Sequence, residues 1–363
     1  MNVCAVLVNY RGTGEIARAV MSVLADAPGI DIVVVDNSDD PQEWAHLESM
    51  LPLSVRRVRA PGNIGFGQGC NLAMGQTQAS FIFLVNPDVR LLPGCTQALH
   101  DTLLASPELA AVSPRQFLDN GCQWLLPPSW LPTALRSWVE ERALRQPQAA
   151  RRLARAARSE NLRFWTTSQP IRQRALSGGA MMVRRSALMP GEPLFDPRYF
   201  MYFEDTDLCM RLRRRGLHLA VVPAARAIHA WRNQPHKATM MAASAKVYFD
   251  KFFPSDSTWM TKSRTVAEGP ISTPYDFTPF PAGGVQIPAH WHSNWLLELS
   301  PSPLIQPAIA LFGRGSHLTA PYDVLPHFES ASVFGRLSCS SSPDDPRLNK
   351  YFCWPSVGTS CVE

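Results

Sequence analysis

The sequence of 363 residues contains no apolar run of about 18 residues, the length that a membrane-spanning helix needs. Its longest apolar stretches, such as 81–85, have the length of strands. The first residues, Met1 to Cys4, lack the basic segment that opens a secretory signal peptide. We therefore expect a cytoplasmic protein that touches the inner face of the cell membrane at most peripherally.

Closely spaced cysteines are also missing. The eight cysteines lie far apart and form no C-x-x-C pair, which argues against a zinc ribbon and against a disulfide scaffold. Reduced thiols, as in a cytoplasm, are the expectation.

Lysine is scarce, with 5 residues against 30 Arg, and the net charge of +5 is unevenly distributed. Residues 136–163 hold eight Arg and three Glu and so carry the whole net charge. One local Arg cluster without a base-reading or stacking pattern does not predict a nucleic-acid partner. One hypothesis is that this segment contacts anionic lipid headgroups through Arg151, Arg152, Arg155 and Arg158, and the alternative is a solvated helix face.

The first 110 residues alternate apolar runs with segments of helical length. Near-continuous, β-branched apolar runs are typical of strands that are buried on both faces. This alternation predicts right-handed βαβ units and an α/β fold, a Rossmann-like sheet with helices on both faces. The predicted strands are 3–8, 30–36, 53–58 and 81–85, and the predicted helices are 15–24, 42–50 and 68–76.

The pattern changes twice along the chain. Residues 119–172, rich in Trp, Pro and Arg, interrupt it and predict a helical insertion within a domain of residues 1–254. After Pro254 the composition shifts, since 14 of the 32 prolines fall in the last 110 residues. Short apolar runs between Ser, Pro and Gly turns predict a β-rich region over 255–363, of unknown role, such as a small sandwich. Its Trp291, Trp295 and Trp354 either stack on glycan or pack internally.

Polar residues crowd the ends of the predicted strands. Asn9-Tyr10 follows the first strand, Asp36 ends the second, and Asn86-Pro87-Asp88 follows the fourth. Ligands of open α/β sheets bind outside the carboxyl ends of the strands, so these residues mark the expected site.

A glycine-dense segment, residues 59–71, follows the third strand. Such a loop lets backbone N–H groups approach a phosphate or a sugar, and the helix that follows favours anions. Its spacing is not that of a dinucleotide fingerprint. The alternative is a plain strand-to-helix turn.

Three acidic side chains are candidates for chemistry. Asp88 is suited to Mg²⁺ or Mn²⁺ because a hard cation binds through one or two carboxylates and substrate phosphates, although it is equally suited to cap a helix near Pro93. Glu204 and Asp205 follow an aromatic run that would raise one pKa, as a general base requires. They also suit the amino terminus of a helix over 208–215.

Together these segments resemble glycosyltransferase family 2, of the GT-A fold, in its rhamnosyltransferase-like branch. The likeness covers residues 1 to about 253 in order. The matching strings are Val8-Asn9-Tyr10, Val34-Val35-Asp36-Asn37-Ser38, Asn63-Ile64-Gly65-Phe66-Gly67 with Gly69 and Asn71, Leu84-Val85-Asn86-Pro87-Asp88, Ser177-Gly178-Gly179-Ala180, and Phe203-Glu204-Asp205 with Asp207 and Arg211.

The resemblance implies a role for each matching residue. Asp205 would be the catalytic base with Glu204 beside it, Asp88 the metal carboxylate, His229 a support for the metal and diphosphate, and Gly178-Gly179 part of an acceptor loop. The donor would be bound by Asn9, Tyr10, Asp36, Asn63, Gly65, Phe66, Asn71, Asn86 and Asp88.

The expected function is that of an inverting glycosyltransferase. It would move a hexose such as rhamnose from a nucleotide-diphosphate donor to a glycan or lipid-linked acceptor in cell-surface polysaccharide synthesis, with Mg²⁺ or Mn²⁺. A sugar-phosphate nucleotidyltransferase and a non-catalytic carbohydrate-binding protein are the alternatives.

Overall fold

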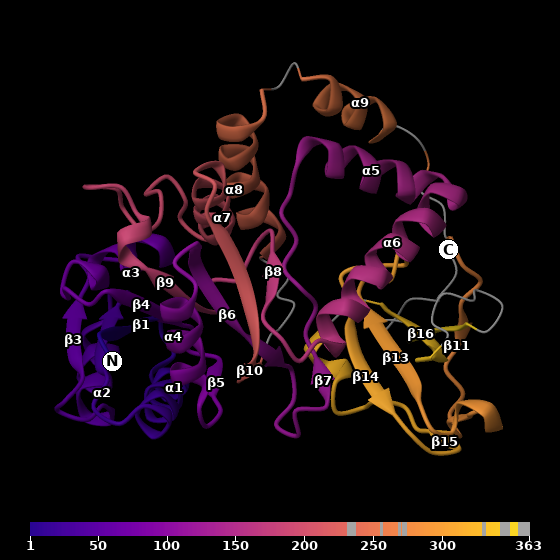
Figure 1. The fold of residues 1–363 in the computed structure, drawn as a ribbon, viewed down its shortest axis with the longest axis horizontal. Coiled ribbons are helices and arrows are strands. Elements are labelled where there is room, and N and C mark those ends of the chain that lie inside the picture. The colour runs from indigo at the N-terminus through magenta and orange to yellow at the C-terminus, as the bar shows by residue number, and fades with distance from the viewer. Residues whose placement is uncertain are drawn as a thin grey trace.

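The computed structural model describes residues 1–230, 237–254, 257–267, 270, 274–328, 332–341 and 349–354. Its amino-terminal part is built on a sheet with the strand order β3-β2-β1-β4-β9-β6-β10 (Figure 1). Strands β1 to β4 are parallel, β9 is antiparallel to β4 and β6, and β10 is parallel to β6. The bounds are β1 Val3–Asn9, β2 Asp31–Asp36, β3 Arg56–Arg59, β4 Phe81–Val85, β6 Leu109–Phe117, β9 Ala180–Arg184 and β10 His218–His229, with β5 Val89–Leu91 and β8 Ile171–Gln173 pairing with β10.

Helices cover both faces of this sheet. They are α1 Thr13–Asp26, α2 Pro41–Met50 and α4 Cys95–Ala105 on one face, and α3 Phe66–Met74, α7 Glu204–Arg214 and α8 Lys237–Phe252 on the other. Strand β1 shows the cause, since Cys4 and Val6 point into one apolar layer and Ala5 and Leu7 into the opposite one. A strand that is apolar at every position needs cover on both sides. The predicted α/β fold is therefore confirmed.

The third predicted strand is displaced along the chain. Leu53, its expected first residue, is 95% exposed, and β3 begins only at Arg56. This strand lies at the edge of the sheet and pairs only with β2, so its side chains are mostly polar and the apolar pattern locates it poorly.

Beyond the first sheet lies a group of antiparallel strands. Strand β7 Trp124–Leu125 pairs with β6 on one side and with β14 on the other, and so joins the two sheets. The order continues β14-β13-β16-β17-β11, with bounds β14 Ile309–Gly313, β13 Trp295–Ser300, β16 Val333–Cys339, β17 Lys350–Trp354 and β11 Thr278–Pro279. A two-stranded sheet of β12 Val285–Gln286 and β15 His317–Leu318 lies nearby.

In the described part of the chain, the strands from β14 to β11 belong to one sheet. Helix α6, Pro147–Thr166, lies along one face of this sheet (Figure 1), and Val285 of β12 and Leu318 of β15 share an apolar cluster with Leu297 of β13. Helix α5, Ala134–Arg145, packs beside α9, Thr258–Ala267, with the rings of Trp138 and Trp259 5.0 Å apart. Because the insertion packs on the carboxy-terminal part, the domain boundary at residue 254 stays a prediction.

A buried ionic cluster fixes α6 to the second sheet. Arg336 of β16 binds both carboxylate oxygens of Glu298 on β13, at 2.8 and 2.7 Å, and Arg158 of α6 lies 3.1 Å from the same carboxylate. All three side chains are at most 4% exposed. Burial alone would raise the pKa of Glu298, but the adjacent guanidinium groups outweigh it and lower the pKa.

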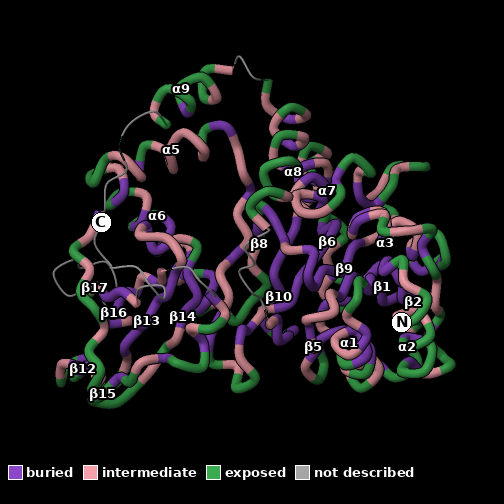
Figure 2. The backbone as a smooth tube through the Cα atoms, turned by 180° about the vertical axis from the view of Figure 1, so that it is seen from behind, coloured by how far each residue is buried: buried purple, intermediate pink, exposed green. Residues whose placement is uncertain are grey.

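The lipid-facing role expected for Arg158 is therefore wrong, because its side chain is enclosed between α6 and the sheet. Arg151, Arg152 and Arg155 lie on the exposed side of the same helix, which Figure 2 shows as an alternation of buried and exposed positions. The glycan-stacking role is also wrong for Trp291 and Trp295, which are 2% and 6% exposed. Trp354 stacks instead on Phe280, 4.8 Å away.

The structure also bears on the expected reduced thiols and on the expected absence of a membrane-spanning helix. Six cysteines are free, whereas Cys353 is disulfide-bonded, so the prediction of reduced thiols is wrong at that position. Within the described ranges, the helices are all too short or too polar to cross a bilayer.

The ionic cluster makes a prediction about stability. Glu298→Ala leaves two buried guanidinium groups without their carboxylate, so we expect the free energy of unfolding to fall by about 3–5 kcal/mol. Replacing all three residues by apolar ones, Arg158→Met with Glu298→Leu and Arg336→Met, is expected to restore much of that loss. Urea denaturation followed by circular dichroism measures both, with the exposed Arg155→Ala as the control within about 0.5 kcal/mol of the parent. A Glu298→Ala protein as stable as the parent would contradict the assignment.

Candidate active site

A cleft of about 700 Å³ opens at the carboxyl edge of the first sheet. Eight of the residues expected in the site line it. They are Phe66, Asn86, Asp88, Gly178, Gly179, Glu204, Asp205 and His229. These residues lie on five separate segments of the sequence, and the fold brings them to one cavity, which we call the acidic cleft.

Helix α7 positions the two adjacent carboxylates. The helix begins at Glu204, directly after Tyr202 and Phe203, whose φ angles of 70° and 65° are both left-handed. Two successive left-handed residues other than glycine cost roughly 1–2 kcal/mol each, so the surrounding structure must hold this turn. The turn places Glu204 and Asp205 in the first helical turn, where the helix dipole favours negative charge.

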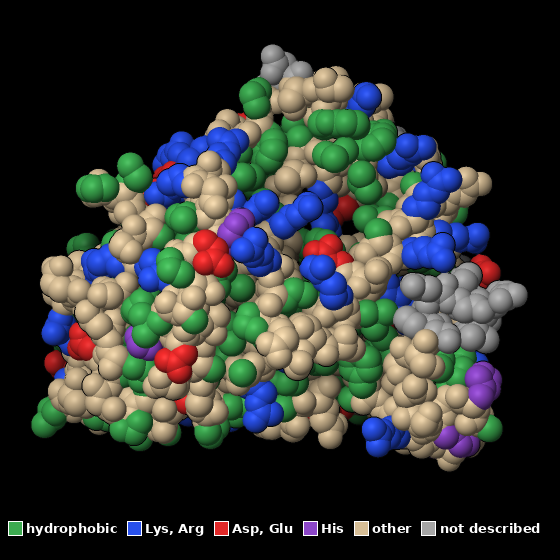
Figure 3. All heavy atoms as spheres, viewed as in Figure 1, with side chains coloured by type: hydrophobic (Ala, Val, Ile, Leu, Met, Phe, Trp, Pro, Cys, Tyr) green, Lys and Arg blue, Asp and Glu red, His purple; other side chains and the backbone are tan. Residues whose placement is uncertain are grey.

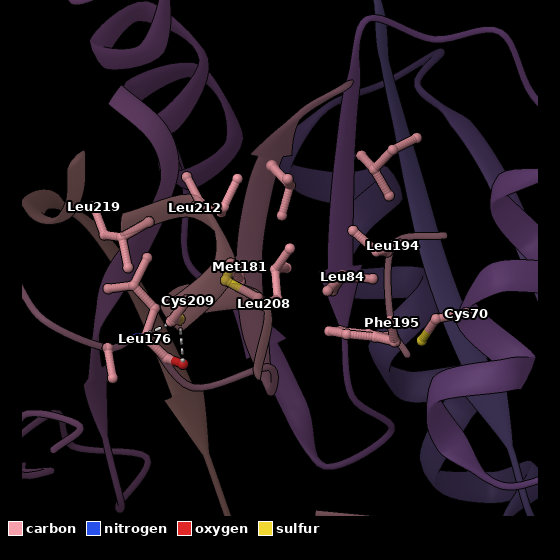
Figure 4. Close-up of a cluster of buried hydrophobic side chains, with 14 of the residues drawn as sticks. Cys70, Leu84, Leu176, Met181, Leu194, Phe195, Leu208, Cys209, Leu212 and Leu219 are labelled. Atoms are coloured by element: carbon pink, nitrogen blue, oxygen red, sulfur yellow. Dashed lines mark hydrogen bonds between the residues drawn. The ribbon is translucent and has the colours of Figure 1, made fainter. Parts of the chain in front are cut away.

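Packing beneath the cleft holds α7 in place. Leu208 and Cys209 enter the apolar layer formed with Leu176 and Met181, as Figure 4 shows. The backbone N–H of Leu176 donates to the Cys209 sulfur at 3.3 Å. This contact ties the helix to the strand segment that leads into the Gly178-Gly179 loop.

Asp205 is held by backbone donors. Its Oδ2 accepts from the N–H of Gly178 at 2.9 Å, and its Oδ1 accepts from the N–H of Thr206 at 2.6 Å. Burial raises the pKa of Asp205, while these hydrogen bonds favour the charged form and oppose the rise. One carboxylate is thereby fixed in direction at the floor of the cleft.

Glu204 is more deeply enclosed than its neighbour. It is 6% exposed, and its Oε2 has no hydrogen-bond partner among the described residues. Burial raises the pKa of Glu204 to about 8, and the adjacent Asp205 adds to the rise. At neutral pH Glu204 is therefore mainly protonated.

His229 and Asp88 meet across the cleft. The His229 Nε2 lies 3.4 Å from Asp88 Oδ2, and its Nδ1 lies 2.7 Å from the side-chain oxygen of Gln116. Since an amide oxygen only accepts, Nδ1 carries a proton, which leaves Nε2 directed at the carboxylate. A Cβ on Gly179 would lie 2.6 Å from the His229 ring, so only glycine leaves room for this histidine.

The expected donor-binding residues of β1 and β2 form a separate network beside the cleft. Asn9 donates to Asp36 Oδ1 at 3.1 Å, and Ser38 donates to the same oxygen at 2.6 Å. The other oxygen of Asp36 is buried and has no hydrogen-bond partner among the described residues. Tyr10 is 48% exposed at the rim. This network does not line the acidic cleft, and the unpartnered oxygen of Asp36 is enclosed by the protein, so the donor-binding role of Asp36 stays a prediction.

The glycine-dense segment packs closely against the backbone of Phe200. A Cβ on Gly65, whose φ is +83°, would lie 2.2 Å from the carbonyl oxygen of Phe200, and the N–H of Phe66 donates to that oxygen at 3.0 Å. Asn63 accepts from Asn37 at 3.0 Å. The loop thus clasps the segment that leads into α7, and only Phe66 of these four expected donor contacts, Asn63, Gly65, Phe66 and Asn71, reaches the acidic cleft.

Asn71 has a structural place. Its amide donates to the carbonyl of Phe195 at 2.7 Å and accepts from the N–H of the same residue at 2.9 Å. Both polar groups of the side chain are thereby engaged with the protein backbone, so we leave Asn71 out of the proposed donor site.

Some residues of the cleft region were not expected from the sequence, and three of them contact or line its polar part. Lys237 and Trp130 line the acidic cleft, and Gln116 binds His229 from behind. Burial lowers the pKa of Lys237, while Asp205 and Asp88 oppose that change. Gln116 lies near the carboxyl end of β6, which runs parallel to β4, and this position is the feature that could have placed it at the site. Nothing in the sequence distinguishes Trp130 as a site residue.

Among the described residues, there is no group of three or more His, Cys, Asp or Glu side chains that could hold a metal ion. Asp88 and His229 supply two such ligands, and Asn86 adds a buried side-chain oxygen that lacks a hydrogen-bond partner in the described part of the chain. This donor set fits a hard cation that completes its shell with substrate phosphates.

Comparisons with known proteins identify the family of this chain. A sequence profile for the glycosyltransferase like family 2 matches residues 2–249. The N-acetylglucosaminyl-diphospho-decaprenol L-rhamnosyltransferase of Mycobacterium tuberculosis is 29% identical over 241 residues, 62% of this chain and 74% of the relative. The low-salt glycan biosynthesis hexosyltransferase of Haloferax volcanii is 24% identical over 261 residues, 69% of this chain and 75% of the relative.

A solved structure, GalNAc-T7 with UDP, GalNAc and Mn²⁺, aligns with 73% of this chain at 16% identity and a TM-score of 0.46. The alignment spans about half of that structure, 54% of its chain. Since the profile covers more than half of this chain, the chain belongs to the glycosyltransferase like family 2, as the motifs led us to expect, and it is a glycosyltransferase.

Proposed function

We propose that this glycosyltransferase moves a hexose, with rhamnose as the first candidate, from a nucleotide-diphosphate donor to a glycan or lipid-linked alcohol, with inversion. One observation carries the proposal: Asp88, His229 and Asp205 share a single cleft at the carboxyl edge of the sheet. The relative from M. tuberculosis is named a rhamnosyltransferase with a lipid diphosphate acceptor, which supports both the sugar and the acceptor class.

Asp205 is the proposed general base. It is held by two backbone N–H groups that favour its charged form, whereas Glu204, with its pKa raised to about 8, is mainly neutral at pH 7. A neutral neighbour also relieves like-charge repulsion on Asp205. Asp205 therefore accepts the proton of the acceptor hydroxyl as that oxygen attacks the anomeric carbon from the side opposite to the diphosphate.

The leaving diphosphate lies in the proposal beside Asn86, Asp88 and His229. A bound Mg²⁺ or Mn²⁺, held by Asp88 with His229, would stabilise the negative charge that develops on the leaving group. Lys237, in the same cleft, adds positive charge beside it. Asp36, with its remaining acceptor oxygen, is the proposed contact for the nucleotide base.

Contact with an anionic membrane stays a hypothesis. The surface that we now consider for it is formed by α5 and α9. Hydrophobic side chains gather over α5 and α9, flanked by Lys and Arg (Figure 3). Among the side chains of these helices, Leu135 of α5 and Trp259 of α9 are 45% and 37% exposed. Exposed apolar groups among basic ones are suited to the headgroup region of a bilayer, where a lipid-linked acceptor would be found.

The first prediction separates this function from its alternatives. Incubation with a panel of nucleotide sugars, including nucleotide-diphosphate rhamnose, is expected to release a nucleoside diphosphate. The release should fall at least tenfold with EDTA and return with Mg²⁺ or Mn²⁺. A nucleotidyltransferase would instead release inorganic diphosphate from a nucleoside triphosphate, and a binding protein would release neither.

The second prediction concerns the base. Asp205→Asn keeps the shape and the contact with Gly178 but cannot accept the proton, so we expect turnover to fall at least about 100-fold. Binding of the nucleoside diphosphate, measured by calorimetry, should stay within about threefold of the parent. Asp101→Asn, on the exposed side of α4, serves as the matched control. A folded Asp205→Asn enzyme with full turnover would remove Asp205 from this role.

The third prediction concerns Glu204 and pH. Because its pKa is raised from 4.5 to about 8 in the folded protein, the folded state binds one proton more than the unfolded state between these values. Stability from this group is fully present below pH 4.5 and is lost by pH 8, at up to about 1.4 kcal/mol per pH unit. Glu204→Gln should therefore gain stability relative to the parent as the pH rises from 5 to 8, in urea denaturation. A constant difference across this range would show that Glu204 does not titrate there.

A further inference from the structure

A second cavity, of about 380 Å³, adjoins the acidic cleft. The two share six lining residues, Trp130, Ser177, Asp205, Thr206, His229 and Lys237. Asp205 thus stands where the two cavities meet. Glu204 and Asp88 line only the acidic cleft. The second cavity, which we call the side pocket, therefore begins at the proposed base and extends beyond the residues that it shares with the acidic cleft.

The walls of the side pocket come from three parts of the chain that the sequence separates widely. The first sheet contributes Val221, the insertion contributes Pro127, Pro128 and Phe164, and the carboxy-terminal sheet contributes Leu299 and Ile309. Strand β7 pairs with β14 and brings these walls together. The carboxy-terminal region, to which the sequence assigned no role, thereby forms one side of a cavity that ends at Asp205.

The side pocket differs from the acidic cleft in chemistry. Beyond the six shared residues, its described lining contains no charged side chain, and its polar members there are Ser113, Gln116 and Ser129. Deep in this pocket a phosphate would lie beyond Lys237 and His229, which line it where it shares residues with the acidic cleft, whereas an apolar group would leave water for a surface of Pro, Leu, Ile and Phe side chains. Binding cavities of 300–1,000 Å³ with apolar walls and a few polar groups commonly hold small organic ligands.

Trp130 stands at the entrance between the two cavities. Its ring packs under the guanidinium of Arg136 at 4.1 Å, and its indole N–H has no hydrogen-bond partner among the described residues. A sugar ring at this entrance would meet an aromatic surface and an available donor, next to the carboxylate of Asp205.

From these observations we infer that the side pocket is an acceptor subsite for an uncharged, apolar aglycone. The acceptor is a glycoside whose reacting hydroxyl lies at Asp205 and whose alkyl or aryl group fills the pocket against Leu299, Ile309 and Pro128. This inference rests on the proposed function for the reacting hydroxyl alone, because the apolar pocket binds an aglycone whether or not transfer follows.

The test uses full-length protein and neutral glycosides of one sugar that differ only in the aglycone. Methyl, n-butyl and n-octyl β-glucosides, and the same series of N-acetylglucosamine, are titrated by calorimetry below the micellar concentration. Each buried methylene should tighten binding about threefold, and we expect the octyl compound to bind at least tenfold more tightly than the methyl compound in at least one series. Equal affinities along both series would overturn the inference.

Variants locate the effect within the molecule. Ser129 is half-buried on the pocket wall, and Ser129→Trp would occupy the space of the aglycone, so the preference for the octyl compound should fall at least fivefold. Ser168→Trp, at an exposed position outside both cavities, is the matched control and should keep the preference. An unchanged preference in a folded Ser129→Trp protein would place the aglycone elsewhere and overturn the assignment.

A charged comparison tests the other part of the inference. The anionic arm uses the glucoside of 8-hydroxyoctanoic acid, which puts a carboxylate at the far end of the alkyl chain, within the apolar walls and away from Lys237 at the entrance. We expect it to bind at least tenfold more weakly than octyl glucoside, and tighter binding would overturn the uncharged acceptor. Nucleoside diphosphate release in the presence of these glycosides is measured in parallel. Its absence with every donor would count against the proposed function, while the chain-length preference would still report on the pocket.

Discussion

The site depends on the close approach of one backbone loop to two side chains. Gly178 donates to Asp205, and the next residue, Gly179, leaves room for the ring of His229 only because it has no Cβ. The same loop is hydrogen-bonded to the residue that follows β4, since the N–H of Asn86 donates to the carbonyl of Gly179 at 2.8 Å. One turn of chain therefore sets the separation of the proposed base from the proposed metal ligands. A side chain at either glycine would disturb that separation before it disturbed the fold.

Glu204 and Asp205 are adjacent in sequence but differ in burial and in hydrogen bonding. We assign their proposed roles from this difference. Glu204 is buried against α3 and has its pKa raised to about 8, whereas Asp205 faces both cavities and is held by backbone donors. Neighbours in sequence thus receive different environments because successive side chains of a helical turn point in different directions. The left-handed turn at Tyr202 and Phe203 sets the helix start and hence determines which carboxylate faces which cavity.

The carboxy-terminal sheet forms one wall of the side pocket, although its composition indicated no role in the site. Strand β13 is buried on both faces, with Leu297 in the apolar layer on one side and Glu298 against Arg158 on the other. The ionic cluster and β7 hold this sheet against the insertion and the first sheet. Leu299 and Ile309 can therefore form a stable wall of the side pocket, although they lie about a hundred residues from Asp205 along the chain.

The sequence by itself determined the α/β sheet and the motifs at its carboxyl edge, because continuous apolar strands and polar strand ends are local patterns. It determined the family for the same reason, since Asn86 to Asp88 and Glu204 to Asp205 are contiguous strings. Four features were decided only by the tertiary structure. They are the packing of Gly65 against Phe200, the hydrogen bonds of Asn71 to the backbone of Phe195, the burial of Arg158 and the pocket beside Trp130. Each of these depends on contacts between segments far apart in the chain, and neither composition nor periodicity records which distant surface a residue will meet.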